Sequence, residues 1–272
     1  MGRLPVRGSA VRELGLPLPP DRLPLLRGGR PLKRWRYVGI YRPDVMLCVG
    51  DAHVAGLPRR WWAVALPDGR LVERAGARRT GAEVAPGRVL VTSPSVKLEL
   101  ELDESAGVEV ASPSGGGWIW TRKQACVPVR GHLSVSGHDW SLAGDDAFID
   151  DSAGYHARHT TWRWSAGIGR ARSGERVAWN LVEGIHDAPE ASERSVWVDG
   201  EPREVGPQPF APDLSSVGAL RFRTWAVRAE RTNRLLVRSR YQQPFGTFSG
   251  ELPGGLVLES GQGVMEWHDV HW

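Results

Sequence analysis

Apolar and polar residues alternate with a period of two along most of this chain of 272 residues. The pattern is clearest at residues 96–103, where Val and Leu alternate with Lys, Glu and Asp. Such alternation is typical of a strand with one face buried and the other in water. Residues 45–49 are apolar throughout, which predicts a strand that is buried on both faces. No segment sustains a period of 3.6 residues, so we expect helices to be few and short.

The same alternation predicts a long series of short strands. Before residue 145 they are expected at residues 35–41, 44–54, 60–66, 71–73, 96–103, 107–111, 118–123, 127–135 and 138–142. After it they are expected at residues 160–166, 176–183, 195–198, 201–205, 220–227, 235–240, 246–252 and 256–259. Turn signals such as Asp199-Gly200 separate neighbouring strands. Many short strands at this spacing predict an all-β protein made of sandwiches or antiparallel barrels.

The distribution of strands and prolines predicts three parts. Residues 1–32 are rich in Pro and Leu, and we expect them to form an extended arm that lies on the body of the protein. Residues 33–145 and residues 146–272 each contain enough predicted strands for an antiparallel barrel or half-barrel of their own.

Composition excludes several classes of function. The net charge is +4, but the basic residues are scattered, whereas nucleic-acid binding needs a clustered basic patch. Two distant cysteines do not make a disulfide framework. No apolar stretch approaches the ~20 residues of a membrane span, and no signal peptide is evident, so a cytoplasmic location is expected. The sequence leaves the oligomeric state open.

Residues 148–183 combine carboxylates, a tyrosine, two histidines and three tryptophans, which predicts one wall of a functional cavity. A carboxyl group desolvated among aromatic rings keeps its proton and can donate it to an apolar carbon. Asp151 is the candidate donor, with Tyr155, His156 or His159 to position the substrate or relay the proton. Alternatively, Asp151 begins a turn and accepts hydrogen bonds from backbone amides.

Metal binding is not expected from the spacing of the histidines. His156 and His159 are three residues apart, so on a strand they point to opposite faces. The same holds for His268 and His271, and no further ligands converge visibly. Glu266 and His268 do share a face, as an acid–histidine pair or as part of a salt-bridged closing strand.

Several motifs after residue 145 resemble a bacterial family known only as a domain of unknown function, number 2804. They are Asp151-x-x-Gly154-Tyr155, Trp162-Arg163-Trp164, Trp179-Asn180-Leu181, Trp197-x-Asp199-Gly200, Tyr241-Gln242-Gln243-Pro244-Phe245-Gly246 and Gly263-x-x-Glu266-x-His268. The resemblance extends over residues 39–272. It departs from the family pattern at Arg163, where a small polar residue is expected between the two tryptophans, and at Ser192-Glu193-Arg194, where an acid followed by asparagine is expected.

That family is distantly similar to carotenoid 1,2-hydratase (hydroxyneurosporene synthase), to AttH-like proteins and to tocopherol cyclase. The similarity implies two lipocalin-like barrels in tandem, a hydrophobic ligand of isoprenoid or polyene type, and non-redox chemistry such as hydration, cyclisation or isomerisation. On this basis we expect a ligand site formed by Trp162, Trp164, Trp179, Asn180, Tyr241, Gln243, Phe245, Glu266 and His268.

Two functional hypotheses follow. The first is a cofactor-independent lyase or isomerase that protonates an alkene of a hydrophobic substrate. The second is a binding protein that carries a lipid or other hydrophobic ligand without chemistry. A desolvated carboxyl group inside the site distinguishes them, because a carrier does not need one. The site could also lie between the two halves of the chain, where ligand clefts are common.

Overall fold

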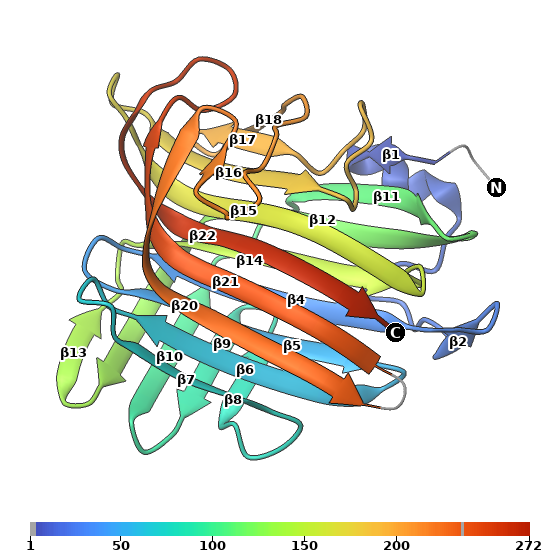
Figure 1. The fold of residues 1–272 in the computed structure, drawn as a ribbon, viewed down its shortest axis with the longest axis horizontal. Coiled ribbons are helices and arrows are strands. Elements are labelled where there is room, and N and C mark those ends of the chain that lie inside the picture. The colour runs from blue at the N-terminus through green and yellow to red at the C-terminus, as the bar shows by residue number, and fades with distance from the viewer. Residues whose placement is uncertain (1–3, 235–236) are drawn as a thin grey trace.

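The computed structural model describes residues 4–234 and 237–272 as two curled antiparallel sheets that pack face to face (Figure 1). The first sheet has the strand order β7-β6-β5-β4-β14-β12-β10-β9-β8, with β11 and β13 paired to β12, and β1 paired to β11. The second has the order β18-β17-β16-β15-β22-β21-β20-β19. This architecture confirms the predicted all-β fold of antiparallel half-barrels.

The first sheet contains β1 (Val6–Arg7), β4 (Lys33–Tyr41), β5 (Met46–Val54), β6 (Leu57–Ala65), β7 (Leu71–Gly76), β8 (Ala82–Ala85), β9 (Arg88–Thr92), β10 (Val96–Leu102), β11 (Val108–Ser114), β12 (Gly117–Val135), β13 (His138–Ser141) and β14 (Asp146–Gly154). The second contains β15 (His159–Ala171), β16 (Arg176–Glu183), β17 (Ser195–Val198), β18 (Glu201–Glu204), β19 (Ser216–Val217), β20 (Leu220–Arg234), β21 (Val237–Gly250) and β22 (Leu258–His271). A small pair, β2 (Leu26–Arg27) and β3 (Arg30–Pro31), and the 3-10 helix η1 (Gly8–Leu14) complete the described chain.

Strand β14 marks the change from one sheet to the other. It pairs with β12 and β4 inside the first sheet, so residues 146–154 lie there and not with the strands that follow them. The chain passes from the first sheet to the second between Gly154 and His159. This is about ten residues after the domain boundary that was predicted from the sequence. Residues 82–92 form β8 and β9, which the alternation did not predict. Residues 235 and 236, where a strand was predicted to begin, lie outside the described ranges, and β21 starts at Val237.

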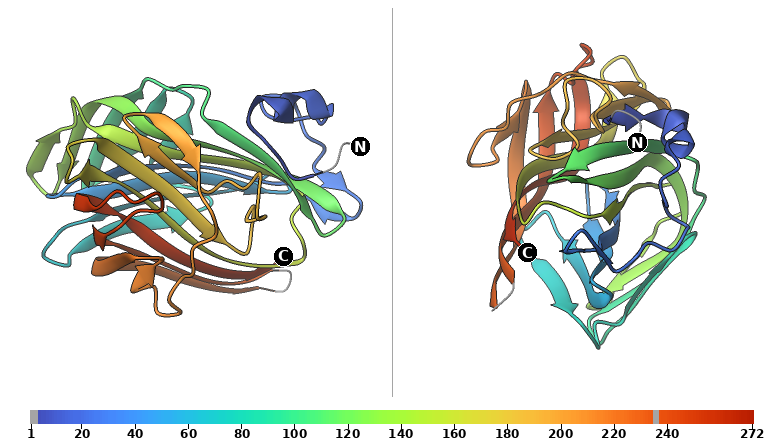
Figure 2. Two further views of the ribbon diagram at one scale, coloured as in Figure 1. Left: turned by 90° about the horizontal axis from the view of Figure 1, so that it is seen from above. Right: turned by 90° about the vertical axis from the view of Figure 1, so that its right-hand side faces the viewer.

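The curled interior of the first sheet is filled by its own side chains. Alternate residues such as Val38, Leu47, Val64, Val89 and Leu98 pack there as one buried apolar cluster. The view in Figure 2 (right) shows the strands curling around this interior. Because apolar side chains fill this interior, it does not hold the polar groups that a functional site needs.

The opposite face of the first sheet packs against the second sheet, and we call the space between them the inter-sheet layer. It is built around buried aromatic residues, among them Phe148 of β14, Trp164 of β15 and Phe245 of β21. In Figure 1 the strands β15, β22, β21 and β20 lie in front of the first sheet and cover it. A third cluster lies on the outer face of the second sheet, where Trp179 and Phe248 pack beneath loop residue Phe210.

The N-terminal arm packs on the first sheet. Val11 in η1 and Leu18 are buried against Trp118 and Trp120 of β12. The short helix differs from the extended arm expected from the prolines, because residues 8–14 contain no proline.

Gly246 in β21 lies where the second sheet bends, and a side chain there would overlap the backbone carbonyl oxygen of Arg223. We expect Gly246→Ala to lower the free energy of unfolding by about 1–3 kcal/mol, because the backbone must move to make room. Gly206 has open space around it, so Gly206→Ala is the matched control. Urea unfolding of both variants checks the prediction, and equal stability would contradict it.

Candidate functional site

Several buried charged residues lie among the aromatic side chains of the inter-sheet layer, including one lysine and three acids. Lys123 is 3% exposed, Asp150 8%, Glu193 2% and Glu266 8%. Lysine, aspartate and glutamate are almost never buried to this extent unless they are paired. Their burial between the sheets therefore makes this layer the candidate site.

Strand pairing brings the first two together. Lys123 on β12 and Asp150 on β14 are register partners, so both side chains point to the same face. The Lys123 Nζ atom lies 2.5 Å from Asp150 Oδ1, and Trp35 of β4 donates from Nε1 to Asp150 Oδ2 at 3.2 Å. Lys123 Nζ also lies 3.4 Å from Glu193 Oε1, so a single ammonium group joins the two sheets.

Glu193 comes from the loop before β17 and is oriented by an amide. Trp164 Nε1 donates to Asn180 Oδ1 at 2.7 Å, which turns the amide so that Asn180 Nδ2 donates to Glu193 Oε1 at 3.3 Å. The other oxygen, Glu193 Oε2, is buried without a hydrogen-bond partner among the described residues. We call Lys123, Asp150 and Glu193 the carboxyl cluster.

Burial raises the pKa of Glu193 to about 7, although the charge of Lys123 acts in the opposite direction. A neutral carboxyl group is therefore abundant near neutral pH. Lys123 is flanked by the two acids, and their charges raise its pKa against the effect of burial. The cluster thus keeps a charged lysine, and its second acid can bind and release a proton near pH 7.

The third buried acid of the layer, Glu266 of β22, is fully hydrogen-bonded. It accepts from Trp162 Nε1 at 2.8 Å, from the Tyr241 hydroxyl at 2.8 Å and from Gln243 Nε2 at 3.1 Å. Burial raises the pKa of Glu266, and the hydrogen bonds from Tyr241 and Trp162 oppose the rise. Nearby, burial lowers the pKa of His268 to about 3, so this imidazole is neutral. Because three donors already bind its carboxylate, Glu266 is suited to holding the side chains of Trp162 and Tyr241 in place.

A hollow of about 270 Å³ opens between β11 and the loop after β16. His186 lies in its lining and is 5% exposed, and its Nδ1 is 2.9 Å from the Ser112 hydroxyl. Its Nε2 has no partner in the part of the chain that the structure describes. Burial and the charge of Lys123 hold the pKa of His186 well below its usual range, so the ring is neutral. This hollow is the candidate entrance. Its lining is Ser112, Pro113, Ser114, Ile119, Ala157, His159, Thr160, Thr161, Gly184, Ile185, His186, Asp187 and Ala188.

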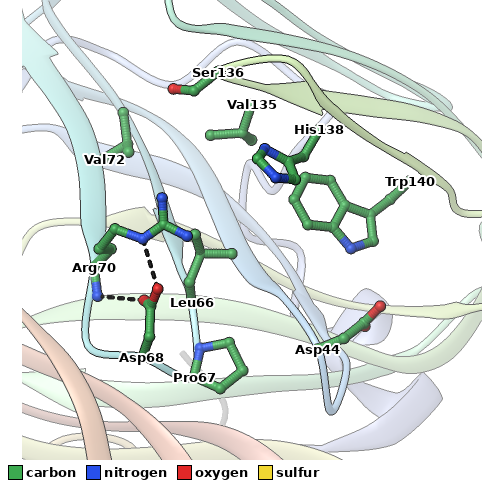
Figure 3. A pocket seen from close by; sticks show the side chains of 10 residues that line it. All are labelled: Asp44, Leu66, Pro67, Asp68, Arg70, Val72, Val135, Ser136, His138 and Trp140. Atoms are coloured by element: carbon green, nitrogen blue, oxygen red, sulfur yellow. Dashed lines mark hydrogen bonds and ion pairs between the residues drawn. The ribbon is translucent and has the colours of Figure 1, made fainter.

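A second hollow, of about 280 Å³, lies at the end of the first sheet (Figure 3). Of its charged residues, Asp68 and Arg70 bond to each other at 2.7 Å, and these two side chains and that of Asp44 are more than half exposed. It offers no buried acid or base comparable with the carboxyl cluster, so we do not assign the site here.

The family model described as a domain of unknown function (DUF2804) matches residues 74–272. The chain belongs to this family. The resemblance found in the sequence motifs is thereby confirmed. A comparison with curated proteins finds no sequence match.

Several solved structures are similar in fold to this DUF2804 protein over most of its chain. Kievitone hydratase from Nectria haematococca is 11% identical with a TM-score of 0.51, over 86% of this chain and 88% of that one. A protein described as AttH from Nitrosomonas europaea is 12% identical with a TM-score of 0.46, over 92% and 97% of the two chains. CghA is 11% identical with a TM-score of 0.41, over 88% of each chain. At such identities the likeness to kievitone hydratase concerns the fold alone.

The inter-sheet layer holds eight of the nine residues predicted to line the ligand site in this DUF2804 protein. They are Trp162, Trp164, Asn180, Tyr241, Gln243, Phe245, Glu266 and His268. The ninth, Trp179, points to the outer face of the second sheet, where its Nε1 donates to Ser165 at 3.1 Å. Trp179 and Asn180 are neighbours on one strand, so their side chains face opposite ways.

The candidate donor Asp151 points away from the inter-sheet layer. Its two oxygens accept hydrogen bonds from the guanidinium groups of Arg36 and Arg122 at 2.7–3.1 Å. A carboxylate held by two guanidinium groups suits an ion pair and not a proton donor. Tyr155 lies beneath the arm and donates from its hydroxyl to the Pro24 carbonyl at 2.7 Å.

The two histidines of this stretch lie in different surroundings. His156 is 1% exposed and lies beside Trp35, with 5.1 Å between the ring centroids. His159 is exposed, stacks on His271 of β22 at 3.9 Å, and lies 2.6 Å from Asp269 Oδ1. His159, Asp269 and His271 each offer a ligand atom within 4.8 Å of the others and could hold a metal ion. Strand pairing brings them together, and spacing along one strand could not show this.

Sequence reasoning missed the carboxyl cluster itself. One signal was available: the chain has only three lysines, and two of them, Lys33 and Lys123, are buried. Because arginine supplies nearly all of the positive charge of this chain, its few lysines are candidates for interior groups. Within the described ranges, no helix is long and apolar enough to cross a membrane.

Proposed function

We propose that this protein is a cofactor-independent lyase or isomerase of the hydratase or cyclase type, acting on an unsaturated, largely apolar small molecule. One observation carries the proposal: Glu193 is a desolvated acid held by Lys123 and Asn180 among aromatic rings, and one of its oxygens has no partner among the residues that the structure describes. A carrier of hydrophobic ligands does not need such a group. The shared fold of a hydratase agrees with the proposal but does not carry it.

In the proposed first step, protonated Glu193 donates its proton to one alkene carbon. A C–H bond forms, the π bond breaks, and a cation develops on the neighbouring carbon. The carboxylate left on Glu193 attracts this cation. The Trp164 ring, with Tyr37 and Phe148 packed against it at 5.6 and 5.9 Å, offers an aromatic face that stabilises positive charge by ~1–2 kcal/mol.

In a hydration, water then attacks the cation and must lose a proton. The neutral His186, in the lining of the entrance hollow, is the base that we propose for this proton. In a cyclisation, a second double bond or hydroxyl of the substrate attacks instead, and the new carbocation or oxonium ion that results loses a proton to His186. In both cases His186 releases its proton to solvent and Glu193 takes one up from solvent, so the cycle closes without a redox step.

The experiment is native mass spectrometry of freshly purified protein, then extraction and identification of the bound compound. That compound and related alkenes are next incubated with the protein in D₂O. The proposal expects deuterium at a former alkene carbon of the product. A retained compound that the protein binds without any deuterium incorporation would support the carrier hypothesis and contradict the proposed function.

A further inference from the structure

A buried lysine without an acidic partner lies beside the carboxyl cluster. Lys33 of β4 is 1% exposed, and among residues 4–234 and 237–272 it makes no ion pair with a carboxylate. Its Nζ atom donates to the His156 backbone oxygen at 3.3 Å and lies 4.4 Å from the centroid of the Trp272 ring. Among the described residues, the other buried cations of the inter-sheet layer are Lys123 and Arg228, and both have carboxylate partners.

Two further groups beside Lys33 also lack partners. Both ring nitrogens of His156 are buried without a hydrogen-bond partner in the described chain, and so is the indole nitrogen of Trp272. The rings of His156 and Trp272 are 6.5 Å apart between centroids. We call Lys33, His156 and Trp272 the donor cluster. Each can donate a hydrogen bond, and within the described part of the chain none has a side-chain acceptor; the backbone of Gly154 is the polar group that acts on the His156 ring.

Buried donors are normally satisfied, and a buried ammonium group is normally paired with an anion. The donor cluster violates both rules in one place, and a single anionic group could satisfy all three donors. The surroundings are aromatic and carry one ammonium group, which suits a singly charged carboxylate better than a phosphate dianion.

We infer that the donor cluster binds a carboxylate group carried by the substrate. The inference rests on the proposed function and deepens it, because it defines the substrate as an unsaturated organic acid. Trp35 supplies the connection. It lies two residues after Lys33 on β4, donates to Asp150, and stacks parallel to Trp162 with 6.4 Å between centroids. An apolar body anchored at Lys33 would extend along these two rings toward the carboxyl cluster.

The test compares probes that differ only in charge. Cinnamate and cinnamyl alcohol are titrated into the protein by calorimetry at pH 6.5, with inorganic phosphate as a competitor. We expect cinnamate to bind at least tenfold more tightly than the alcohol, and phosphate to compete weakly. Equal affinity for acid and alcohol would overturn the inference, as would phosphate competing as well as an organic acid.

Lys33→Met is expected to weaken cinnamate binding at least tenfold and to leave the alcohol unaffected. Met fills the same apolar space, so the variant should fold, and thermal unfolding checks this. Lys97, on the water-exposed face of β10, provides the matched control Lys97→Met, which should bind like the original protein. Burial, together with the positive charge of Arg30, lowers the pKa of Lys33 to about 7, so cinnamate affinity should also fall as the pH rises above 7. Unchanged cinnamate binding in Lys33→Met would contradict the inference.

A second measurement does not depend on a variant. Modification of Lys33 by an acylating reagent, followed by peptide mass spectrometry, should be slowed by cinnamate and not by the alcohol. Failure of this inference is distinguishable from failure of the proposed function. If the protein binds acids selectively through Lys33 but incorporates no deuterium, the proposed function is contradicted and the carboxylate site is retained. Turnover of neutral alkenes with no preference for acids would remove the carboxylate site alone.

Discussion

Replacing Lys123 with methionine is expected to lower the free energy of unfolding by about 3–5 kcal/mol. The ammonium group contacts Asp150 at 2.5 Å and Glu193 at 3.4 Å, and its side chain is 4% exposed. Removing it leaves two buried acids facing each other across the inter-sheet layer without the cation that they share. The loss of one partner of a buried ion pair costs far more than the pair itself contributes.

Denaturant unfolding measures this effect, and Lys97→Met is the control. Lys97 alternates with buried residues on β10 and is exposed, so its substitution should change stability by no more than about 0.5 kcal/mol. The double variant Lys123→Met/Glu193→Gln should regain part of the loss, because one of the two stranded acids is then neutral. A loss below about 1 kcal/mol for Lys123→Met would show that the ammonium group does not hold the sheets together.

The period-two alternation predicted most of the fold because many of the strands, such as β10, have one buried face and one exposed face. It could not assign strands to sheets. Residues 146–154 read as the start of the second half, yet β14 is completely enclosed between β12 and β4 in the first sheet. Strand pairing over such distances depends on tertiary packing, which local sequence does not contain. The short β8 and β9 were missed because their alternation extends over only a few residues.

The candidate site was predicted in part, and the errors follow from strand parity. Asp150 and Asp151 are adjacent, so one faces the inter-sheet layer and the other faces Arg36 and Arg122. A sequence cannot show which parity is inward when both residues are acids. Glu193 comes from a loop and meets Lys123 from 70 residues away in the chain, a contact that no spacing rule encodes.

Glu193→Gln is expected to reduce turnover at least 100-fold, in line with the typical contribution of a general acid. The amide keeps the shape of the side chain and can still contact Lys123 and Asn180, but it has no proton of suitable acidity to donate. Turnover of the compound identified by extraction, followed as deuterium incorporation, measures the loss. Asp151→Asn is the matched control, because Asp151 lies outside the inter-sheet layer and its loss should affect stability more than turnover.

The pH dependence of the free energy of unfolding should also change in Glu193→Gln, and this distinguishes a role in function from a role in folding. Folded Glu193 has a pKa of about 7, against 4.5 as the ordinary value. Between these two pH values the folded protein keeps a proton that the unfolded chain has lost. The contribution of this proton to the free energy of unfolding is therefore complete below pH 4.5. It is lost as the pH rises through 7, by up to roughly 3 kcal/mol in all. Glu193→Gln lacks this titration, so its stability relative to the original protein should rise across that window.

A variant that is inactive and yet at least as stable above pH 7 would show that Glu193 is retained at a cost to folding. Wild-type turnover should also fall as the pH rises above 7, because the proton donor is then ionised. If Glu193→Gln remained fully active, the proposed acid would be wrong. If it lost activity only by unfolding, Glu193 would be a structural partner of Lys123 and nothing more.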